Sequence, residues 1–339
     1  MKTSKFNYSL PENLIAQQPV FPRDSSRLLV LDSSSGKISH HHFCDIVDYL
    51  EKGDVLVLNN SKVIPARLFG EVKGKDGKRA EILLVRKTGP YWECLAGGKK
   101  LKVGDEIVIS PRFSLKIRAK NPERTFLVKF NKSGVEFKLL LLKHGHTPTP
   151  PYIKYEAKES DYQTIYAAIE GSVAAPTVGL HFTKGLLEKL KAKGVAIEFV
   201  TLHVGLGTFL PVKEENLEDH KIHVEYASLS LKTAEKLNKA KREKRRIIAV
   251  GTTTVRVLES TCDNNGRVKP FSGEVDIFIK PGYKFKVVDA MITNFHLPAS
   301  TLLALVCAFG RYNYIMRAYK IAIKNKYRFY SFGDAMFLK

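Results

Sequence analysis

The chain has 339 residues, 44% of them hydrophobic, so it can bury a sizeable core and is long enough for two domains. Its 55 basic and 34 acidic residues give a net charge of +21 and a pI near 9.7, which favours a polyanionic partner such as a nucleic acid, although a solvated basic surface explains the charge almost as well. No stretch is apolar for long enough to span a membrane, the first residues lack the apolar core of a signal peptide, and the four cysteines are too scattered for a disulfide framework or a zinc site.

The pattern of residues 1–60 predicts a mixture of helix and strand. Residues 10–18 are expected as a short helix and residues 27–31 as a strand. The tract His40-His41-His42 resembles a metal-binding sequence, but three adjacent side chains cannot all face one ion, so we discount it. Residues 54–58 predict a buried strand that runs into the polar loop 59–62. Loops at the carboxyl ends of strands are where α/β proteins place ligands.

Between residues 63 and 143 the pattern changes to short alternating runs separated by turn residues. The runs expected as strands are 80–86, 91–95, 106–109, 115–118, 125–130 and 135–139. Regular spacing without a helical period is typical of a small antiparallel barrel. We therefore predict an α/β main domain formed by residues 1–62 and 144–339, with an inserted small antiparallel β-barrel domain at 63–143. Basic residues at outward barrel positions suit a phosphate backbone or a solvated face: Lys99, Lys100, Lys102, Arg112 and Lys116.

Helices and strands alternate in the rest of the chain, which is typical of an α/β protein. Helices are expected at 160–169, from Thr183 to Gly194, at 231–244 and at 318–325, on the basis of capping residues and apolar periodicity. Strands are expected at 196–204, 247–250, 274–279, 286–288 and 327–330.

One stretch combines chemistry with a buried helix. The apolar run 302–310 has the length of a buried helix, with Pro298 in its first turn and Gly310 at its end. Asn294, His296 and Thr301 therefore lie at the mouth of a helix, where free N–H groups suit an anion or a carbonyl group. Ser300 and Thr301 could equally be plain helix caps.

Four more loops place small, hydroxyl-bearing or imidazole residues at junctions between elements. Their candidate binding residues are Thr177 and His181, His203 with Gly205 and Gly207, Thr252 with Thr253 and Arg256, and Arg328 with Asp334. The G-x-G pair lacks the third glycine of a dinucleotide fingerprint, since Leu210 stands there, and the loop before Arg256 lacks the lysine of a P-loop. Carboxylates are scarce in these loops, so histidines are the natural proton carriers near neutral pH.

Ordered motifs run nearly end to end and include A-A-P-T at 174–177, G-L-H-F-T at 179–183, T-L-H-V-G at 201–205, G-T-T at 251–253, T-N-F-H-L-P at 293–298 and Y-R-F at 327–329. In these motifs the chain closely resembles the S-adenosylmethionine:tRNA ribosyltransferase-isomerase family of queuosine biosynthesis. Val178 departs from the alanine usual in the family, and 275–276 lacks an expected nearby threonine.

The resemblance implies an enzyme that transfers and isomerises the ribosyl group of S-adenosylmethionine onto 7-aminomethyl-7-deazaguanine in the anticodon loop of tRNA. Epoxyqueuosine forms, and adenine and methionine are released. S-adenosylmethionine is then a consumed substrate, so no cofactor or metal is expected, and we expect a cytoplasmic monomer without a membrane segment. The rival hypotheses are a non-enzymatic RNA-binding protein and an ordinary methyltransferase.

For this reaction we form a hypothesis about the roles of the candidate residues. His203 and His181 are candidate general bases, and His296 with Asn294 would orient sugar hydroxyl groups. Arg256 would bind the methionine carboxylate or a tRNA phosphate, and Asp334 a cationic group or the deazaguanine amino group. The other expected substrate contacts are Thr177, Gly205, Gly207, Thr252, Thr253, Thr301 and Arg328.

Overall fold

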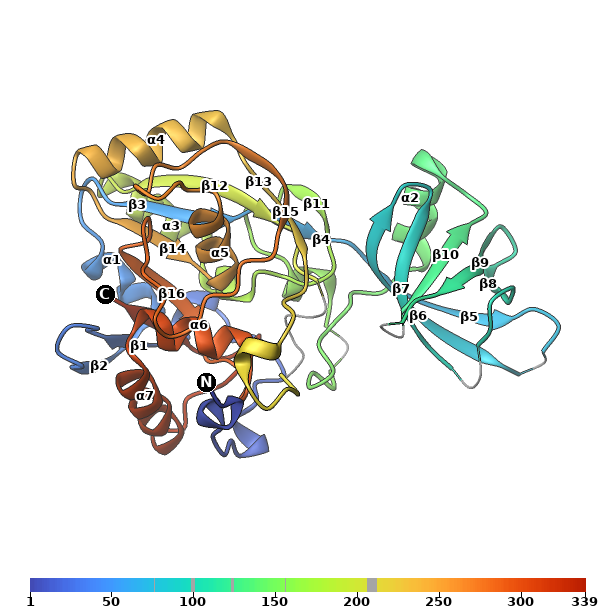
Figure 1. Ribbon diagram of the computed structural model, residues 1–339, viewed down its shortest axis with the longest axis horizontal. Helices are drawn as coiled ribbons and strands as arrows, with labels where there is room; N and C mark the ends of the chain where they lie inside the picture. Colours follow the sequence, from blue (N-terminus) through green and yellow to red (C-terminus); the bar gives the residue numbers. More distant parts are fainter. Residues whose placement is uncertain (76, 99–100, 123–124, 156, 206–211) are drawn as a thin grey trace. The chain divides into compact units, whose positions relative to one another are not determined.

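The structure is a computed structural model that describes residues 1–339 except 76, 99–100, 123–124, 156 and 206–211. It divides into two compact units (Figure 1). The first comprises Met1–Lys62, Pro150–Ile169 and Ala175–Lys339, and the second comprises Val63–Thr149 and Glu170–Ala174. The predicted combination of an α/β unit with a small antiparallel barrel is confirmed.

The first unit is built on a nine-stranded mixed sheet of order β15-β13-β12-β3-β14-β16-β17-β1-β2. The strands are β1 Arg27–Leu31, β2 Ile38–His42, β3 Val55–Asn59, β12 Ala196–Leu202, β13 Glu225–Leu229, β14 Ile247–Val250, β15 Phe271–Val275, β16 Ala290–Asn294 and β17 Ala335–Leu338. Four neighbours, β12, β3, β14 and β16, run parallel to one another. Three of them, β3, β14 and β16, are buried along their whole length, as expected for parallel strands covered on both faces.

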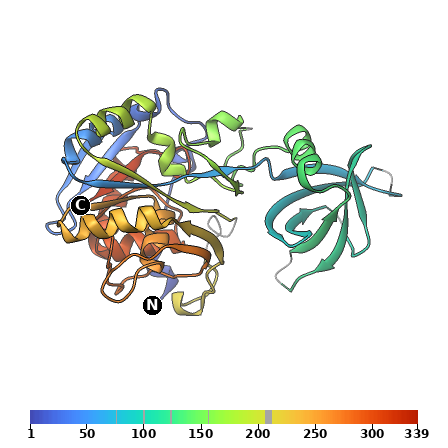
Figure 2. The ribbon, with the colours of Figure 1, turned by 90° about the horizontal axis from the view of Figure 1, so that it is seen from above.

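Helices cover both faces of this sheet. They are α1 Ile46–Tyr49, α3 Lys184–Ala192, α4 Leu231–Arg242, α5 Thr252–Ser260, α6 Thr301–Phe309 and α7 Tyr312–Lys324. Because β3 to β12 and β14 to β16 step in opposite directions along the sheet, right-handed crossovers put α3 and α5 on opposite faces. The view in Figure 2 separates these helices accordingly.

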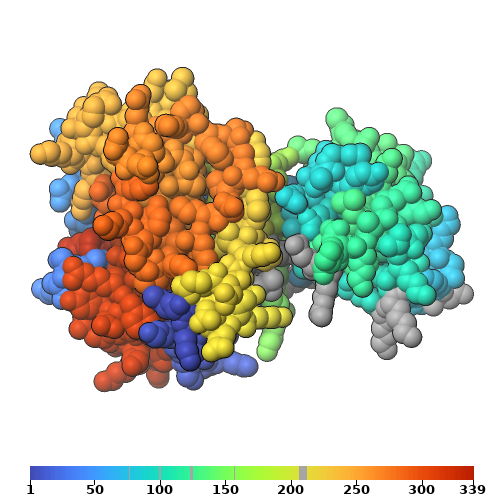
Figure 3. All heavy atoms as spheres, viewed as in Figure 1, coloured from blue at the N-terminus to red at the C-terminus, as the bar shows by residue number. Residues whose placement is uncertain are grey.

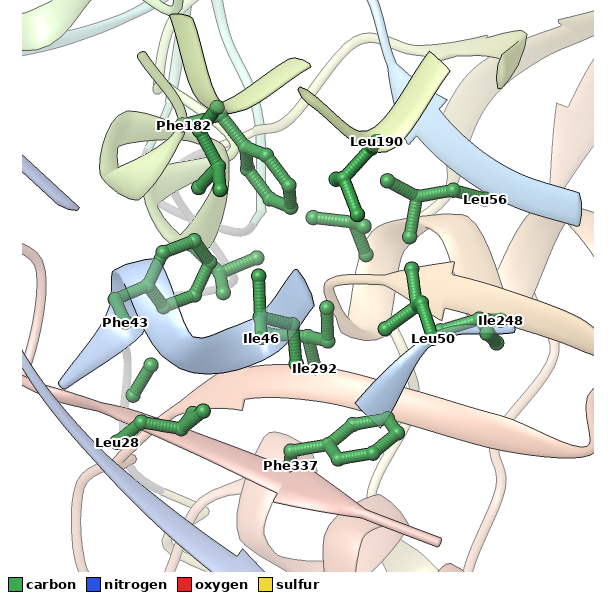
Figure 4. Packing of buried hydrophobic residues seen from close by; sticks show 14 of the residues in the cluster. Leu28, Phe43, Ile46, Leu50, Leu56, Phe182, Leu190, Ile248, Ile292 and Phe337 are labelled. Atoms are coloured by element: carbon green, nitrogen blue, oxygen red, sulfur yellow. The ribbon is translucent and has the colours of Figure 1, made fainter. Parts of the chain in front are cut away.

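The core on the α1 and α3 face is a continuous apolar cluster (Figure 4). Leu56 of β3, Ile292 of β16 and Phe337 of β17 come from the sheet, and Phe43 and Leu190 close over them. All five side chains are fully buried. This cluster holds the central strands in register and so keeps the edge of the sheet in a fixed shape.

The second unit is a closed antiparallel barrel of order β10-β7-β6-β5-β8-β9. Its elements are β5 Arg67–Val72, β6 Arg79–Thr88, β7 Tyr91–Gly97, β8 Glu106–Ser110, β9 Phe113–Lys120, β10 Phe126–Phe130 and α2 Gly134–His144. The prediction of a strand at 135–139 was wrong, because these residues form the first turns of α2. The apolar residues continue through the rest of the helix, beyond the usual length of a strand. The short sheet β4 Ser61–Val63 with β11 Ile169–Ser172 completes the strands.

Several local predictions in the first unit were also wrong. The expected helices at 10–18 and 160–169 shrink to the 3₁₀ turns Glu12–Leu14 and Glu159–Tyr162. The expected strand at 327–330 makes only an isolated bridge, through Phe329, while β17 directly after it was missed. Short polar or four-residue segments carry too little periodicity to predict.

The N-terminus is fastened to the segment that follows β12. The Thr3 amide donates to the Glu215 carbonyl over 2.9 Å, and the Leu217 amide donates to the Met1 carbonyl over 2.9 Å. Figure 3 shows this contact as the dark blue atoms beside the yellow ones. In the part of the chain that the structure describes, every helix is too short or too polar to cross a bilayer.

We predict that Leu56→Ala lowers the free energy of unfolding by about 2–5 kcal/mol, because it leaves a cavity beneath fully buried neighbours. Leu231→Ala is the matched control, since Leu231 on α4 is 60% exposed, and its effect should stay within about 0.5 kcal/mol. Urea unfolding followed by circular dichroism measures both. Equal losses in the two variants would contradict the assignment of Leu56 to the core.

Candidate functional site

The parallel strands bring distant loops to one edge of the sheet. Because β12, β14 and β16 are parallel, the residues that follow them, Val204, Gly251 and Phe295, emerge at the same edge. β17 is antiparallel to β16, so the segment before it, with Tyr330, reaches that edge as well. This edge therefore combines loops that are far apart in the sequence.

A pocket with an empty volume of about 530 Å³ lies at this edge, and we call it the central pocket. Its polar lining consists of Tyr152, Thr177, Thr252, Thr253, Thr293, Asn294, His296, Tyr330 and Ser331. Five of the predicted site residues therefore share one pocket: Thr177, Thr252, Thr253, Asn294 and His296.

The Asn294 side chain is held at the floor of the central pocket. Its Oδ1 accepts from the Thr177 hydroxyl over 3.4 Å, and its Nδ2 donates to the Tyr330 carbonyl over 3.2 Å. The same Nδ2 lies 3.3 Å from His181 Nε2. Tyr330 has a φ of 69°, a left-handed conformation that is costly for a residue with a side chain. The strained turn at Tyr330 therefore presents its carbonyl to Asn294.

His181 lies behind Asn294 and not in the lining of the central pocket. Its Nδ1 lies 2.7 Å from the Ser26 hydroxyl, and its ring stacks on Phe43 with 4.8 Å between ring centroids. Burial lowers the pKa of His181 to about 3, and the charges of Arg328 and Arg23 add to the effect. The imidazole is therefore neutral near pH 7 and reaches the pocket through Asn294.

His296 lines the central pocket and is also neutral. Its Nε2 lies 2.7 Å from the Thr293 hydroxyl, and its amide donates to the Tyr319 hydroxyl over 2.9 Å. Burial lowers the pKa of His296 to about 3. Because an effective general base has a pKa near the working pH, His296 is better suited to hydrogen bonding than to proton abstraction.

His203 also lies outside the central pocket, so His296 is the only one of the three candidate histidines among the described lining residues. Side chains alternate along β12 and its extension, so Val204 lines the pocket, and His203 lies on the other side of the strand end. The His203 ring stacks on Tyr226 with 6.1 Å between centroids. Its Nδ1 has no hydrogen-bond partner among the described residues, and partial burial lowers its pKa.

A second cavity, with an empty volume of about 410 Å³, lies next to the central pocket, because Leu302 lines both. Arg256, Glu225 and Thr301 are among its lining residues. Arg256 Nη1 donates to Glu225 Oε2, and the Gly205 amide donates to Glu225 Oε1 over 2.8 Å. Of the predicted residues, Arg256 and Thr301 thus belong to this cavity, and Gly205 supports it from behind.

Helix α6 begins later than the sequence predicted. Pro298 was expected in the first turn, but Ala299 has a φ of 50° and the helix starts at Thr301. Ser300 is its N-cap, since the Ser300 hydroxyl accepts from the Leu303 amide over 3.2 Å. The alternative of a plain cap is therefore confirmed for Ser300.

Arg328 and Asp334 lie outside both pockets. Asp334 is 2% exposed and accepts from the amides of Arg27 and Arg328, over 3.0 and 2.8 Å. The Arg328 guanidinium donates to the Gln18 carbonyl. The carboxylate therefore holds the turn before β17. The predicted site residue Gly207 lies outside the described residues.

Tyr152 and Ser331 were not predicted as site residues, although both line the central pocket. Their hydroxyl oxygens lie 2.8 Å apart, and the Tyr152 ring packs against Tyr330 with 4.7 Å between centroids. The clue in the sequence was the proline-rich segment 148–151, which holds the next residue in a stiff, extended chain.

Comparison with known proteins places nearly the whole chain in one family. The family model described as "Queuosine biosynthesis protein" matches residues 3–338. The S-adenosylmethionine:tRNA ribosyltransferase-isomerases of Acetivibrio thermocellus and Thermoanaerobacter sp. are 53% and 51% identical to this chain, each over 100% of both chains. The crystal structure of S-adenosylmethionine tRNA ribosyltransferase from Thermotoga maritima is 39% identical, with a TM-score of 0.57, and the match covers 99% of this chain and 100% of that one.

We predict that the wild type has a larger free energy of unfolding than His181→Gln at pH 7, and that this difference, the stability gap, becomes smaller as the pH falls. The folded state keeps His181 neutral down to about pH 3, whereas the unfolded chain takes up a proton near pH 6.5, so acid destabilises only the wild type through this group. The gap should shrink by about 1.4 kcal/mol per pH unit below pH 6.

Urea unfolding at pH 7, 6 and 5 measures this gap. Phe43→Leu is the control, because it disturbs the packing against the same ring without removing a titrating group, and its gap should not depend on pH. If the stability gap for His181→Gln were also independent of pH, the assignment of His181 as a buried, neutral imidazole would be wrong.

Proposed function

The chain belongs to the queuosine biosynthesis protein family, and from this premise we propose that its central pocket is the site where S-adenosylmethionine is broken down. The protein is an S-adenosylmethionine:tRNA ribosyltransferase-isomerase, a transferase, and not a non-enzymatic RNA-binding protein. It transfers and isomerises the ribosyl group onto 7-aminomethyl-7-deazaguanine in tRNA, giving epoxyqueuosine, adenine and methionine. S-adenosylmethionine is thus a consumed substrate and not a cofactor.

The observation that carries the proposal is the set of hydrogen-bonding groups in the central pocket. The Asn294 amide and the hydroxyls of Thr177 and Thr293 are of the kind that recognises sugar hydroxyl groups. The Thr253 hydroxyl is buried without a hydrogen-bond partner among the described residues. A ligand hydroxyl or ring nitrogen would satisfy it, because buried polar groups are normally paired.

Helix α5 contributes an electrostatic effect. It follows β14 through Gly251, whose φ of 92° favours glycine, so the helix begins directly at the pocket. Thr252 and Thr253 in its first turn line the pocket, so free N–H groups and the positive end of the helix dipole face the ligand. This environment stabilises negative charge that develops on the departing adenine.

We propose roles in proton transfer for the three candidate histidines from their hydrogen-bond partners and from the directions in which their pKa values shift. A base removes the activated proton next to the sulfonium, adenine leaves with the C–N bond electrons, the tRNA amine attacks, and epoxide closure expels methionine. We propose His203 as the general base, because its Nδ1 has no partner among the described residues. Its ring lies outside the lining of the central pocket, so the reacting carbon next to the sulfonium would lie at the rim of the pocket, at the end of β12. His181 and His296 stay neutral and orient Asn294 and the sugar.

The tRNA substrate accounts for the charge and the aromatic residues. The net charge of +21 suits an RNA backbone, and the paired rings of Tyr152 and Tyr330 at the central pocket suit an unstacked base from the anticodon loop. Arg328 would contact a tRNA phosphate, with Asp334 holding its backbone. A tRNA substrate also implies a cytoplasmic enzyme, and we propose that it acts as a monomer.

We expect the purified protein to release adenine and methionine in equal amounts from S-adenosylmethionine and a tRNA that carries the aminomethyl base. Chromatography of the small-molecule products measures both. A tRNA without the aminomethyl group is the control and should give neither product. Formation of S-adenosylhomocysteine would instead identify a methyltransferase, and binding of tRNA without any product would identify an RNA-binding protein.

We expect His203→Ala to lower kcat by about 10²–10⁴-fold, the usual contribution of a general base, without changing the affinity for tRNA. His42→Ala is the matched control, since His42 is exposed on β2. Single-turnover adenine release and a tRNA binding titration measure the two quantities. Equal loss of turnover and tRNA affinity would overturn the assignment of the base.

A further inference from the structure

Arg256 is a buried arginine that uses only part of its hydrogen-bonding capacity. Its residue exposure is 5%, and Nη1 donates to Glu225, which is equally buried. Nε and Nη2 are both buried and have no hydrogen-bond partner among the described residues. Buried donors are normally paired, so two open donors on one charged group call for an explanation.

The two open donors lie on the same edge of the guanidinium. Nε–H and Nη2–H point in parallel and form the fork that binds a carboxylate through two hydrogen bonds. The same chain shows this fork in use elsewhere. Arg246 donates from Nε to Asp54 Oδ1 over 3.0 Å and from Nη2 to Asp54 Oδ2 over 2.5 Å. In Arg256 the corresponding edge bonds to no carboxylate of the described residues, and Glu225 accepts from the remaining nitrogen.

The location of this edge relates it to the central pocket. Arg256 lies on α5 one helical turn beyond Thr252 and Thr253, so the three side chains are neighbours along one side of the helix. Arg256 lines the second cavity, Thr252 and Thr253 line the central pocket, and Leu302 lines both. A ligand seated in the central pocket can therefore extend a short arm past Leu302 toward Arg256.

We propose that the open fork of Arg256 binds the carboxylate of the methionine arm of S-adenosylmethionine, and that Glu225 is the positioning residue that holds the guanidinium in place. This inference rests on the proposed function. The methionine arm is a short carbon chain that ends in a carboxylate, which matches both the fork and the position of Arg256 in the cavity next to the central pocket. A tRNA phosphate shares the anionic chemistry, but an arginine side chain that is only 7% exposed suits the end of a slender arm better than a polymer backbone.

The first test compares S-adenosylmethionine with its decarboxylated form, which keeps the sulfonium and the amine but lacks the carboxylate. Calorimetry with the full-length wild type, in the presence of an unmodified tRNA that cannot react, gives both dissociation constants. The decarboxylated form should bind about 10- to 100-fold more weakly, as expected for the loss of charge-assisted hydrogen bonds. Equal affinities would overturn the inference.

The second test removes the fork without leaving a buried charge. The double variant Arg256→Gln with Glu225→Gln removes both charges of the pair, because removal of one partner alone could unfold the protein. This double variant should bind the two ligands with similar affinity. Its affinity for S-adenosylmethionine should fall, and its affinity for the decarboxylated form should stay at the wild-type level. Arg256→Lys, which keeps the charge but not the fork, should lose most of the discrimination as well.

The matched control is the double variant Arg246→Gln with Asp54→Asn, which removes a comparable ion pair at the opposite ends of the parallel strands. It should keep the wild-type discrimination. Retained discrimination in the Arg256 double variant, or a loss of tRNA affinity in place of ligand discrimination, would overturn the inference and in the second case point to a phosphate.

Failure of this inference is distinguishable from failure of the proposed function. If the wild type releases adenine from S-adenosylmethionine but does not discriminate against the decarboxylated form, only the assignment of Arg256 is wrong. If the wild type neither binds S-adenosylmethionine nor releases adenine, the proposed function itself is wrong.

Discussion

The site depends on the parallel pairing of β12, β3, β14 and β16. The carboxyl ends of parallel strands lie at the same edge of a sheet. Loops that are tens of residues apart in the sequence therefore meet at this edge. The helices that follow β14 and β16 both begin at this edge, and residues of their first turns, Thr252 and Leu302, line the pocket. The buried apolar cluster beneath these strands fixes the shape of that edge.

Burial determines the protonation states and the hydrogen-bonding needs of the polar residues of the site. An imidazole in a low-dielectric environment loses its proton, so His181 and His296 act as neutral hydrogen-bonding groups and fix Asn294 and Thr293. The same burial makes any unpaired donor costly, which is why the Thr253 hydroxyl and the open edge of Arg256 point to a ligand. A single physical effect thus sets both the protonation states and the binding capacity.

The sequence predicted the elements whose periodicity is strong. The fully apolar strands β3 and β14 and the capped helix α3 were found because buried strands and caps leave clear patterns. The alternation of apolar and polar residues at 135–139 led to a wrong prediction, because the first turns of α2 have the same local pattern as a strand. Nothing local indicates that His203 lies outside the lining of the pocket or that Tyr152 belongs to it, because both depend on strand register and tertiary contacts.

The central claim is that S-adenosylmethionine lies at the carboxyl ends of the parallel strands. A crystal structure of the protein with S-adenosylmethionine bound tests it most directly. The account predicts that the ribose lies within hydrogen-bonding distance of Asn294 and the Thr253 hydroxyl, with adenine near the first turn of α5. Density for the ligand in the barrel, or at the amino ends of the same strands beside Asp54 and Arg246, would contradict it.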